Sequence, residues 1–355
     1  MTSTPSPLVL LAPAPQSRDV IFTPDTWRLM QQTFTVIEPD LTTTAGTEQF
    51  DELLPIAFAV VGQPDLPRER LETARELRAV CNVEGNFFPN VDYKTCADRG
   101  VYVLGCGPAY AQPVAEYGLG LGLDIARGIS RADRLFRVGD EQYTAAGNAD
   151  AMLLRRADIG LIGFGNLGRA LARLLAPFDA TIRVHDPWLP DAVLRDAGVQ
   201  PSGLEELLTH SKLVFVLATI TDESTQLLDA ARLDLLPDKA RLVLLSRAAA
   251  ADFDALYERI ASGRLIAAID VWPTEPMPAD DAARGLDGAT LSAHRAGGIR
   301  EAFHDIGAMV LDDLTLIRRG LPPARMQVAA RELVTRYRSR PVSEVLGTTS
   351  DDEGS

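Results

Sequence analysis

The sequence predicts an α/β protein with two domains, each built on a parallel sheet that helices cover. Three observations favour this class. Short apolar runs typical of buried strands alternate with helical segments along most of the chain. The alternation begins twice, near residue 8 and again near residue 158. The length of 355 residues is also sufficient for two hydrophobic cores.

The first series of elements occupies roughly the first hundred residues. We expect strands at residues 8–12, 56–61, 79–83 and 101–104, with helices at 24–33 and 68–77. A long helical segment follows at 114–136 and contains Gly118, Gly120 and Gly122. Each of these glycines costs up to about 1 kcal/mol relative to alanine in a helix. They indicate either close backbone packing, including packing against a partner subunit, or a bent or interrupted helix.

The second series begins after a polar stretch at residues 140–150, which we interpret as a surface loop. Strands are expected at 159–162, 181–185, 213–217, 242–245, 266–271 and 290–292. Apolar residues at helical spacing predict a last helix at 301–318, which we expect to return to the first domain. The acidic, serine-rich end at 339–355 is predicted to be a disordered tail.

Composition and charge exclude several classes of function. The net charge of −14 disfavours binding to nucleic acid or to anionic membranes. No apolar run approaches the roughly 20 residues that a membrane helix needs, and residues 1–7 lack a basic signal segment. Cys81, Cys96 and Cys106 have no metal-type spacing, so we expect reduced thiols, no metal site and a cytoplasmic protein.

A glycine-rich turn at residues 163–168 predicts a dinucleotide site. The sequence Gly163-Phe164-Gly165-Asn166-Leu167-Gly168 follows an apolar strand and opens a helix whose apolar residues have helical spacing. Gly163 permits a tight turn, Gly165 lets the backbone approach a pyrophosphate, and Gly168 lets the helix pack on the strand. The helix start and its dipole would favour the phosphates.

Asp186 ends the next predicted strand. A carboxylate at this position accepts hydrogen bonds from ribose hydroxyls and repels a 2′-phosphate. Pro187 and Trp188 follow it, with no arginine immediately after to favour NADP. The alternative is a glycine-rich turn with an ordinary surface aspartate. We predict NAD as the cofactor.

Three side chains at later strand ends form a candidate catalytic set. Arg247 follows the strand at 242–245, and its guanidinium suits a bidentate carboxylate, although an ordinary surface arginine is the alternative. Glu275 and His294 follow the next two strands. A neighbouring carboxylate raises the pKa of a histidine and fixes its tautomer, which suits proton transfer to a carbonyl. A structural histidine is the alternative here.

The region from about residue 80 to residue 298 resembles the D-isomer-specific 2-hydroxyacid dehydrogenases, which include phosphoglycerate, D-lactate, glyoxylate/hydroxypyruvate and formate dehydrogenases. Several motifs, in order along the chain, carry the resemblance. They are Asn90-Val91-Asp92, Val114-Ala115-Glu116, the turn that ends at Gly168, His185-Asp186-Pro187, Ser246-Arg247 followed by Asp252-Phe253-Asp254-Ala255-Leu256, Asp270-Val271-Trp272-Pro273-Thr274-Glu275-Pro276, and His294-Arg295-Ala296-Gly297.

The resemblance implies specific roles for these residues. It implies that Arg247 binds the substrate carboxylate, that His294 is the general acid/base and that Glu275 orients His294. Backbone at Asn166 and Leu167 would contact the pyrophosphate, with Ser246, Asp270 and Gly297 near the nicotinamide. The reaction would be NAD-dependent hydride transfer between a small 2-hydroxy acid and its 2-oxo acid.

The resemblance also implies the domain arrangement. A flavodoxin-like substrate domain, residues 1–113 and 299–338, would be split around a Rossmann NAD domain at 114–298. The family commonly dimerises through the helix that matches 114–136, so we expect a homodimer.

The sequence departs from the family pattern at the turn whose amides usually hold the substrate carboxylate. Gly85-Asn86-Phe87 stands there, with Phe87 in place of the second glycine. We expect Gly85, Asn86 and Phe87 to bind substrate, although Phe87 would otherwise fill the domain core. Val83-Glu84 replaces a basic residue usual in phosphoglycerate dehydrogenases, and a carboxylate there would repel a phosphate. This makes 3-phosphoglycerate a less attractive substrate.

Two rival functions remain open from the sequence. Arg247 would also hold a tetrahedral oxyanion, so oxidation of a phosphonate or phosphite is an alternative within enzymes. The family also contains transcriptional corepressors, and the presence of Arg247, Glu275 and His294 does not exclude a non-catalytic, NAD-sensing protein. The sequence does not identify the acid, the physiological direction or the size of the oligomer.

Overall fold

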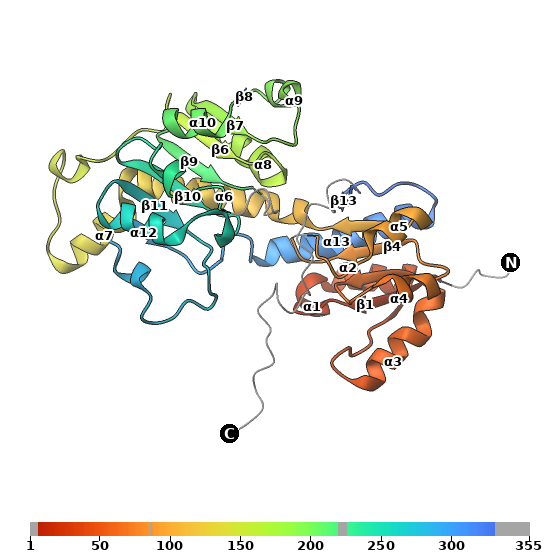
Figure 1. Ribbon diagram of the computed structural model, residues 1–355. Coiled ribbons are helices and arrows are strands. Elements are labelled where there is room, and N and C mark those ends of the chain that lie inside the picture. Colours follow the sequence, from red (N-terminus) through yellow and green to blue (C-terminus); the bar gives the residue numbers. More distant parts are fainter. Residues whose placement is uncertain (1–5, 86, 219–225, 331–355) are drawn as a thin grey trace. The chain divides into compact units, whose positions relative to one another are not determined.

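The computed structural model describes residues 6–85, 87–218 and 226–330, which form two compact units (Figure 1). One unit combines both ends of the chain, up to Tyr110 and from Ile299 onward, and is called the split unit below. The other unit, Ala111–Gly298, is called the central unit. The tail expected at residues 339–355 lies outside the described residues.

The split unit contains a sheet in the order β13-β5-β4-β3-β1-β2. Its strands are parallel except β13, which pairs antiparallel with β5. The parallel part therefore has the order 2-1-3-4-5 of flavodoxin-like folds. The strands are β1 (Leu8–Ala12), β2 (Thr35–Ile37), β3 (Ala57–Gly62), β4 (Ala79–Asn82), β5 (Tyr102–Gly105) and β13 (Gln327–Val328).

The apolar strands of the split unit are buried on both faces because helices cover the sheet on both sides. Val9 and Val61 point into one core cluster, while their neighbours Leu10 and Val60 point into the other. The last helix packs on α1, α2 and β4 (Figure 1). The helices are α1 (Arg18–Ile21), α2 (Pro24–Thr33), α3 (Thr44–Leu53), α4 (Arg68–Thr73), α5 (Tyr93–Arg99) and α13 (Arg300–Arg318), with a 3-10 turn at Leu54–Ile56.

The central unit contains a second parallel sheet, in the order β12-β11-β10-β9-β6-β7-β8. Numbered along the unit, this order is 7-6-5-4-1-2-3, the doubly wound Rossmann arrangement. The strands are β6 (Asp158–Ile162), β7 (Thr181–His185), β8 (Gln200–Pro201), β9 (Leu213–Val216), β10 (Ala240–Leu244), β11 (Leu265–Ile269) and β12 (Ala289–Leu291). The predicted fold class, two doubly wound parallel sheets, is therefore confirmed.

Helices cover this second sheet as well (Figure 1). They are α6 (Gly107–Arg127), α7 (Ile129–Val138), α8 (Asn166–Leu175), α9 (Asp191–Asp196), α10 (Leu204–His210), α11 (Ala230–Leu233) and α12 (Phe253–Ala261). Short 3-10 turns lie at Ala146–Asn148, Ala176–Phe178, Ala248–Ala250 and Ala282–Gly285. The first residues of α6, Gly107–Tyr110, group with the split unit, and the rest groups with the central unit.

The helical segment expected at residues 114–136 is interrupted at Gly128, which separates α6 from α7, so the alternative of an interrupted helix holds, although not at the glycines singled out from the sequence. Gly128 has φ of +64°, a left-handed conformation that ends α6. Two of the three glycines singled out from the sequence allow close packing inside the same chain. A Cβ on Gly118 would lie 2.6 Å from Leu245 Cδ1, and a Cβ on Gly122 would lie 2.7 Å from Phe215 Cζ. Gly120 faces open space.

Other elements differ from the sequence prediction for local reasons. The helix expected at 68–77 ends at Thr73, because Ala74 leaves helical geometry with ψ of 71°. Helix α3 was not predicted, since its sequence is mostly polar. Among the described residues, no helix is both long enough and apolar enough to cross a membrane. All three cysteines are buried free thiols, and the cytoplasmic location stays a prediction.

Candidate active site

The predicted phosphate-binding turn lies between β6 and α8, at the carboxyl edge of the central sheet. Gly163 has φ of +96°, and a Cβ there would lie 2.8 Å from Ala218 Cα. A Cβ on Gly168 would lie 2.4 Å from the carbonyl oxygen of Gly163, so only glycine lets the helix approach the turn this closely. A Cβ on Gly165 would meet nothing within 4 Å. Gly163 and Gly168 thus occupy crowded positions of the type that the sequence predicted, and the approach of a pyrophosphate to Gly165 stays a prediction.

The start of α8 provides donors for an anion. Gly165 is the N-cap residue and offers no side-chain cap to the helix, which begins at Asn166 and continues through Leu167. The first amide groups of an α-helix have no backbone acceptor within the helix and point out of its start. Together with the open space at Gly165, these amides fit the pyrophosphate of NAD.

Asp186 follows β7 and is fixed by two backbone amides. Its Oδ2 accepts a hydrogen bond from the amide of Phe164 at 2.8 Å, and its Oδ1 accepts one from the amide of Trp188 at 3.0 Å. The carboxylate therefore lies beside the glycine-rich turn. Each oxygen has a second lone pair with which to accept a ribose hydroxyl.

Ser246 and Arg247 leave the end of β10. Ser246 is 8% exposed, and its buried Oγ has no hydrogen-bond partner among the described residues. An unpaired buried hydroxyl at a strand end is expected where a ligand supplies the missing partner. Arg247 is exposed, and its Nη1 donates to the carbonyl of Ser246 at 2.9 Å.

The chain after Arg247 is fastened to the segment that leads into α11. The amide of Leu228 donates to the carbonyl of Ala250 at 2.9 Å, and the amide of Asp252 donates back to the carbonyl of Leu228 at 3.0 Å. These two bonds flank the turn that follows Arg247. They hold the turn at Ala248–Ala250 in place.

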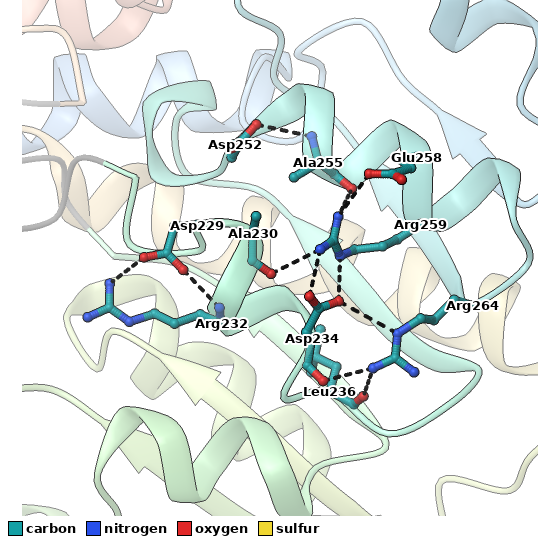
Figure 2. A network of polar contacts seen from close by, with 10 residues as sticks. All are labelled: Asp229, Ala230, Arg232, Asp234, Leu236, Asp252, Ala255, Glu258, Arg259 and Arg264. Carbon is teal, nitrogen blue, oxygen red and sulfur yellow. Dashed lines mark hydrogen bonds and ion pairs between the residues drawn. The ribbon is translucent and has the colours of Figure 1, made fainter.

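Figure 2 shows the polar network that supports this region, between α11 and α12. Arg259, whose side chain is 11% exposed, donates to both oxygens of Asp234 at 2.9 Å and to the carbonyls of Ala230 and Ala255. The hydrogen bond from Arg259 holds the pKa of Asp234 below its usual range. One guanidinium thus ties α11 to α12, and α11 follows the segment that pairs with the turn after Arg247.

Glu275 and His294 are in direct contact. Nδ1 of His294 lies 2.7 Å from Oε2 of Glu275. A carboxylate can only accept, so this bond requires the proton on Nδ1 and leaves Nε2 to exchange a proton with a substrate. The two side chains are 42% and 35% exposed, which leaves the pair accessible to a small molecule.

Arg247, Glu275 and His294 follow β10, β11 and β12, which are neighbours in the sheet. Parallel strands end at the same edge, so the three residues share one edge of the central sheet with the glycine-rich turn after β6. The bond between Glu275 and His294 agrees with the sequence prediction of an acid/base pair. The catalytic roles themselves stay predictions.

Asp270 makes a contact that the sequence did not indicate. It is 1% exposed, and its two carboxylate oxygens accept hydrogen bonds from the amides of Arg295 at 2.9 Å and Ala296 at 3.0 Å. Its own carbonyl accepts from the amide of His294 at 2.8 Å. His294 has φ of +50°, a conformation that non-glycine residues rarely adopt. Asp270 therefore holds the backbone that carries the imidazole, and Gly297 lies in the same loop.

Three further residues near the pair, Trp272, Ser292 and Tyr117, were given no role from the sequence. The indole Nε1 of Trp272 donates to the carbonyl of Ser292 at 2.7 Å, and the hydroxyls of Ser292 and Tyr117 lie 2.6 Å apart. Trp272 stands in the motif at residues 270–276, and its position after a strand end was the available signal. A metal site is not indicated in the described part of the chain, which holds no cluster of three potential ligands.

The residues expected to bind substrate in the split unit lie after β4. A Cβ on Gly85 would lie 3.3 Å from the ring of Tyr110. The ring of Phe87 lies against Gly105 and makes an edge contact with Tyr93, with a centroid distance of 6.4 Å. These contacts favour the core-filling alternative for Phe87, and contact with a substrate stays a prediction. Asn86 lies outside the described residues.

Comparisons with known proteins give the family. Residues 119–296, half of the chain, match the family model described as D-isomer specific 2-hydroxyacid dehydrogenase, NAD binding domain. The chain is 29% identical over 260 residues to a glyoxylate reductase of Korarchaeum cryptofilum (strain OPF8), which covers 72% of this chain and 77% of that protein. It is 27% identical over 284 residues to a hydroxypyruvate reductase of Thermotoga maritima, over 78% of this chain and 90% of that protein.

A solved structure is also similar over most of the chain. It is that of a phosphoglycerate oxidoreductase from Rhizobium etli, with a TM-score of 0.83 and 43% sequence identity, over 92% of this chain and 99% of that one. The glycine-rich turn, the glycine N-cap of α8 and the Ser246 hydroxyl, which has no hydrogen-bond partner among the described residues, agree with the family's cofactor. The chain therefore belongs to the D-isomer specific 2-hydroxyacid dehydrogenase family and is an NAD-dependent oxidoreductase that interconverts 2-hydroxy acids and 2-oxo acids.

Proposed function

We propose that the substrate is a small 2-hydroxy acid or its 2-oxo partner, and that Arg247, Glu275 and His294 carry out the reaction. The observation that carries this proposal is the 2.7 Å contact between His294 Nδ1 and Glu275 Oε2. It leaves Nε2 of an accessible imidazole as the proton carrier. Arg247 leaves a neighbouring strand end and supplies the planar donors that match a carboxylate.

Each residue has one task in this proposal. Arg247 binds the substrate carboxylate and so orients the carbon next to it. His294 Nε2 gives a proton to the oxygen on that carbon during reduction and takes it back during oxidation. Glu275 keeps the proton on Nδ1 and stabilises the imidazolium that forms in the oxidative direction. NAD bound at this site would supply the hydride acceptor for the hydroxy acid, and NADH would supply the hydride donor for the oxo acid.

The proposed cofactor contacts involve this chain's own residues as follows. The amides of Asn166 and Leu167 donate to the pyrophosphate, and Asp186 accepts from the adenosine ribose. Ser246 and Gly297 lie near the nicotinamide. Asp270 also belongs to this region, where both of its oxygens already accept backbone amides.

The test of the acid/base assignment is His294→Gln. We expect kcat to fall by on the order of 100-fold or more, because general acid–base catalysis contributes about that much. The dissociation constant for NADH, followed by fluorescence, should be unchanged. His210→Gln is a matched control, since His210 is an exposed histidine of the same unit whose ring, among the described residues, bonds a backbone carbonyl alone. Near-normal turnover by His294→Gln would contradict the proposal.

The identity of the acid is a finer question. The Rhizobium etli relative is named as a phosphoglycerate oxidoreductase, so 3-phosphoglycerate belongs in any substrate panel. Glu84, which follows β4 and accepts a hydrogen bond from Gln16 at 3.1 Å, speaks against it. A carboxylate beside Gly85, where we propose substrate binds, would repel a phosphate. We therefore propose acids without a phosphate, such as glyoxylate or hydroxypyruvate, as better substrates.

Steady-state assays over a panel of acids, followed by the absorbance of NADH, separate the rival functions. Turnover of 2-oxo acids supports the proposal. Turnover of phosphite or a phosphonate alone would favour the oxyanion alternative. Tight binding of NADH with no turnover of any acid would favour a non-catalytic, NAD-sensing role like that of the corepressors.

We further propose a homodimer formed through α6 and α7. Helix α7 has no buried residue, and Ile129, Phe136 and Val138 are 58%, 63% and 72% exposed. Ile129 and Phe136 are seven residues apart and therefore share one face of the helix. A surface groove of about 640 Å³, which Tyr117, Ile129 and other residues line, runs between α6 and β12. Figure 1 shows α7 and the segment after it projecting from the central unit. A second copy could cover both the apolar face and the groove in a two-fold arrangement.

Light scattering coupled to size-exclusion chromatography tests this surface. The wild-type chain should elute as a dimer, and Phe136→Asp should shift it to the monomer. Ile56→Asp is the control, because Ile56 is 61% exposed but belongs to the split unit. A wild-type monomer, or an undisturbed Phe136→Asp dimer, would exclude this interface.

A further inference from the structure

The Glu275–His294 pair has little intrinsic rigidity. Its two side chains stand on separate loops, after β11 and after β12, and both are more than one-third exposed. Ion pairs and hydrogen bonds between exposed side chains are weak because water competes and both side chains lose freedom. The 2.7 Å contact therefore requires something that fixes one loop relative to the other.

Trp272 joins these two loops. Its backbone amide donates to Glu275 Oε1 at 2.9 Å, which turns the other carboxylate oxygen toward the imidazole. Its indole Nε1 donates to the carbonyl of Ser292 at 2.7 Å, two residues before His294. The ring is 7% exposed and packs against Phe253, with a centroid distance of 6.2 Å. A buried ring fixes the direction of its N–H, and among aromatic residues of this size only tryptophan offers that donor.

Tyr117 holds the same loop through a second contact. It belongs to α6, and its hydroxyl lies 2.6 Å from the hydroxyl of Ser292. A second bond, from Thr290 Oγ1 to Asp124 Oδ2 at 2.6 Å, ties α6 to β12 nearby. Ser292 is thus fixed through its carbonyl by Trp272 and through its hydroxyl by Tyr117.

We propose that Trp272, Ser292 and Tyr117 are positioning residues that hold Glu275 and His294 in the geometry for proton transfer. Hydrogen bonds connect all five residues, from α6 to the imidazole, within the central unit. This inference rests on the proposed function, because it assumes that His294 moves the proton. It assigns kinetic roles to three residues that contact neither substrate nor cofactor in the proposed mechanism.

Single substitutions that remove one donor or acceptor test the proposal. Trp272→Phe keeps an aromatic ring but loses the Nε1 donor, and we expect kcat to fall roughly five- to twentyfold, the effect of about one hydrogen bond or somewhat more. Tyr117→Phe and Ser292→Ala both remove the hydrogen bond between the hydroxyls of Tyr117 and Ser292. Each should lower kcat about two- to fivefold, and the double variant should be no worse than either one. The dissociation constant for NADH and the KM for the oxo acid should change less than about twofold.

A background without the partner carboxylate separates positioning from general loss of structure. In Glu275→Gln, adding Trp272→Phe should lower kcat by less than about twofold, because the carboxylate that Trp272 positions against His294 is already gone. Trp27→Phe, in α2 of the split unit, is the matched control for loss of an indole and should leave kcat unchanged. If Trp272→Phe folds poorly, Tyr117→Phe and Ser292→Ala carry the test.

Two results would overturn the proposal. One is a kcat within twofold of wild type in Trp272→Phe, Tyr117→Phe and Ser292→Ala. The other is an undiminished effect of Trp272→Phe in the Glu275→Gln background, which would mean that the residues act independently. Failure of the underlying function looks different, because His294→Gln would then retain turnover. An inactive His294→Gln with unaffected positioning variants refutes only the present inference.

Discussion

Replacement of Asp270 by asparagine should disable the enzyme without removing any group that reacts. The carboxylate is 1% exposed and accepts the amides of Arg295 and Ala296. Asparagine has the same shape, but only one of its two terminal atoms can accept a hydrogen bond. The amide nitrogen of the new side chain would face one of these backbone N–H groups, so two donors would oppose each other.

These contacts determine how much stability the substitution removes. A hydrogen bond to a charged group contributes about 1.5–3 kcal/mol, and a buried unsatisfied donor costs at least about 1 kcal/mol more. Asp270→Asn should therefore destabilise the protein by about 3 kcal/mol. The φ of +50° at His294 carries strain of about 1 kcal/mol or more, which the loop can relieve once these bonds weaken. A shift of the imidazole by about 1 Å is enough to lower kcat by about 100-fold.

The assay compares Asp270→Asn with Asp313→Asn. Asp313 is fully buried in α13 of the split unit and accepts the backbone amides of Ala324, Arg325 and Met326. Asp313→Asn should lower the free energy of urea unfolding by a similar amount, while its kcat per folded molecule stays near the wild-type value. Only Asp270→Asn should combine the loss of stability with the loss of turnover. A kcat of Asp270→Asn within threefold of wild type would refute the reasoning.

Three further outcomes are expected. Gly122→Ala should lower the free energy of urea unfolding by about 1–2 kcal/mol, because its Cβ would lie 2.7 Å from the buried ring of Phe215. Gly118→Ala meets only the flexible end of a side chain, so its free energy of unfolding should stay within about 0.5 kcal/mol of the wild-type value. Equal stabilities of the two variants would contradict this. A backbone hydrogen bond at the start of α5 lowers the pKa of Asp92. The ionised carboxylate therefore stabilises the fold above the unfolded pKa of about 4, and this contribution is lost as the pH falls through the lower folded pKa. Asp92→Asn keeps the cap, so its melting temperature should fall less than that of the wild type between about pH 5 and pH 2, and an equal fall would argue against this role of Asp92. Burial raises the pKa of Cys96 to about 12. A thiol reagent at about pH 8 should therefore modify the native protein far more slowly than the unfolded chain. Rapid modification of the native protein would show that the thiol is not buried.

The sequence was sufficient for the class of fold and for the outline of the site. Parallel strands buried on both faces are continuous apolar runs, so they can be recognised without tertiary information. The turn from Gly163 to Gly168 can also be recognised locally, because its glycines lie at fixed spacing within six residues, although the close approach of Ala218 to Gly163 comes from tertiary packing. Strand ends also indicated that Arg247, Glu275 and His294 share one edge, since consecutive parallel strands all end there.

Contacts between distant segments required the tertiary structure. The position of the break, at Gly128, was not predicted, since the flanking residues are compatible with one helix and only its φ of +64° ends α6. The sequence placed Asp270 near the cofactor by resemblance, but not against the loop of His294. Nothing in the sequence around Trp272 or Ser292 indicates that the indole of Trp272 donates to the carbonyl of Ser292 in another loop. Periodicity and turn chemistry depend on neighbours along the chain, whereas a hydrogen bond between loops depends on how two strands are placed side by side, and only the packed sheet determines that.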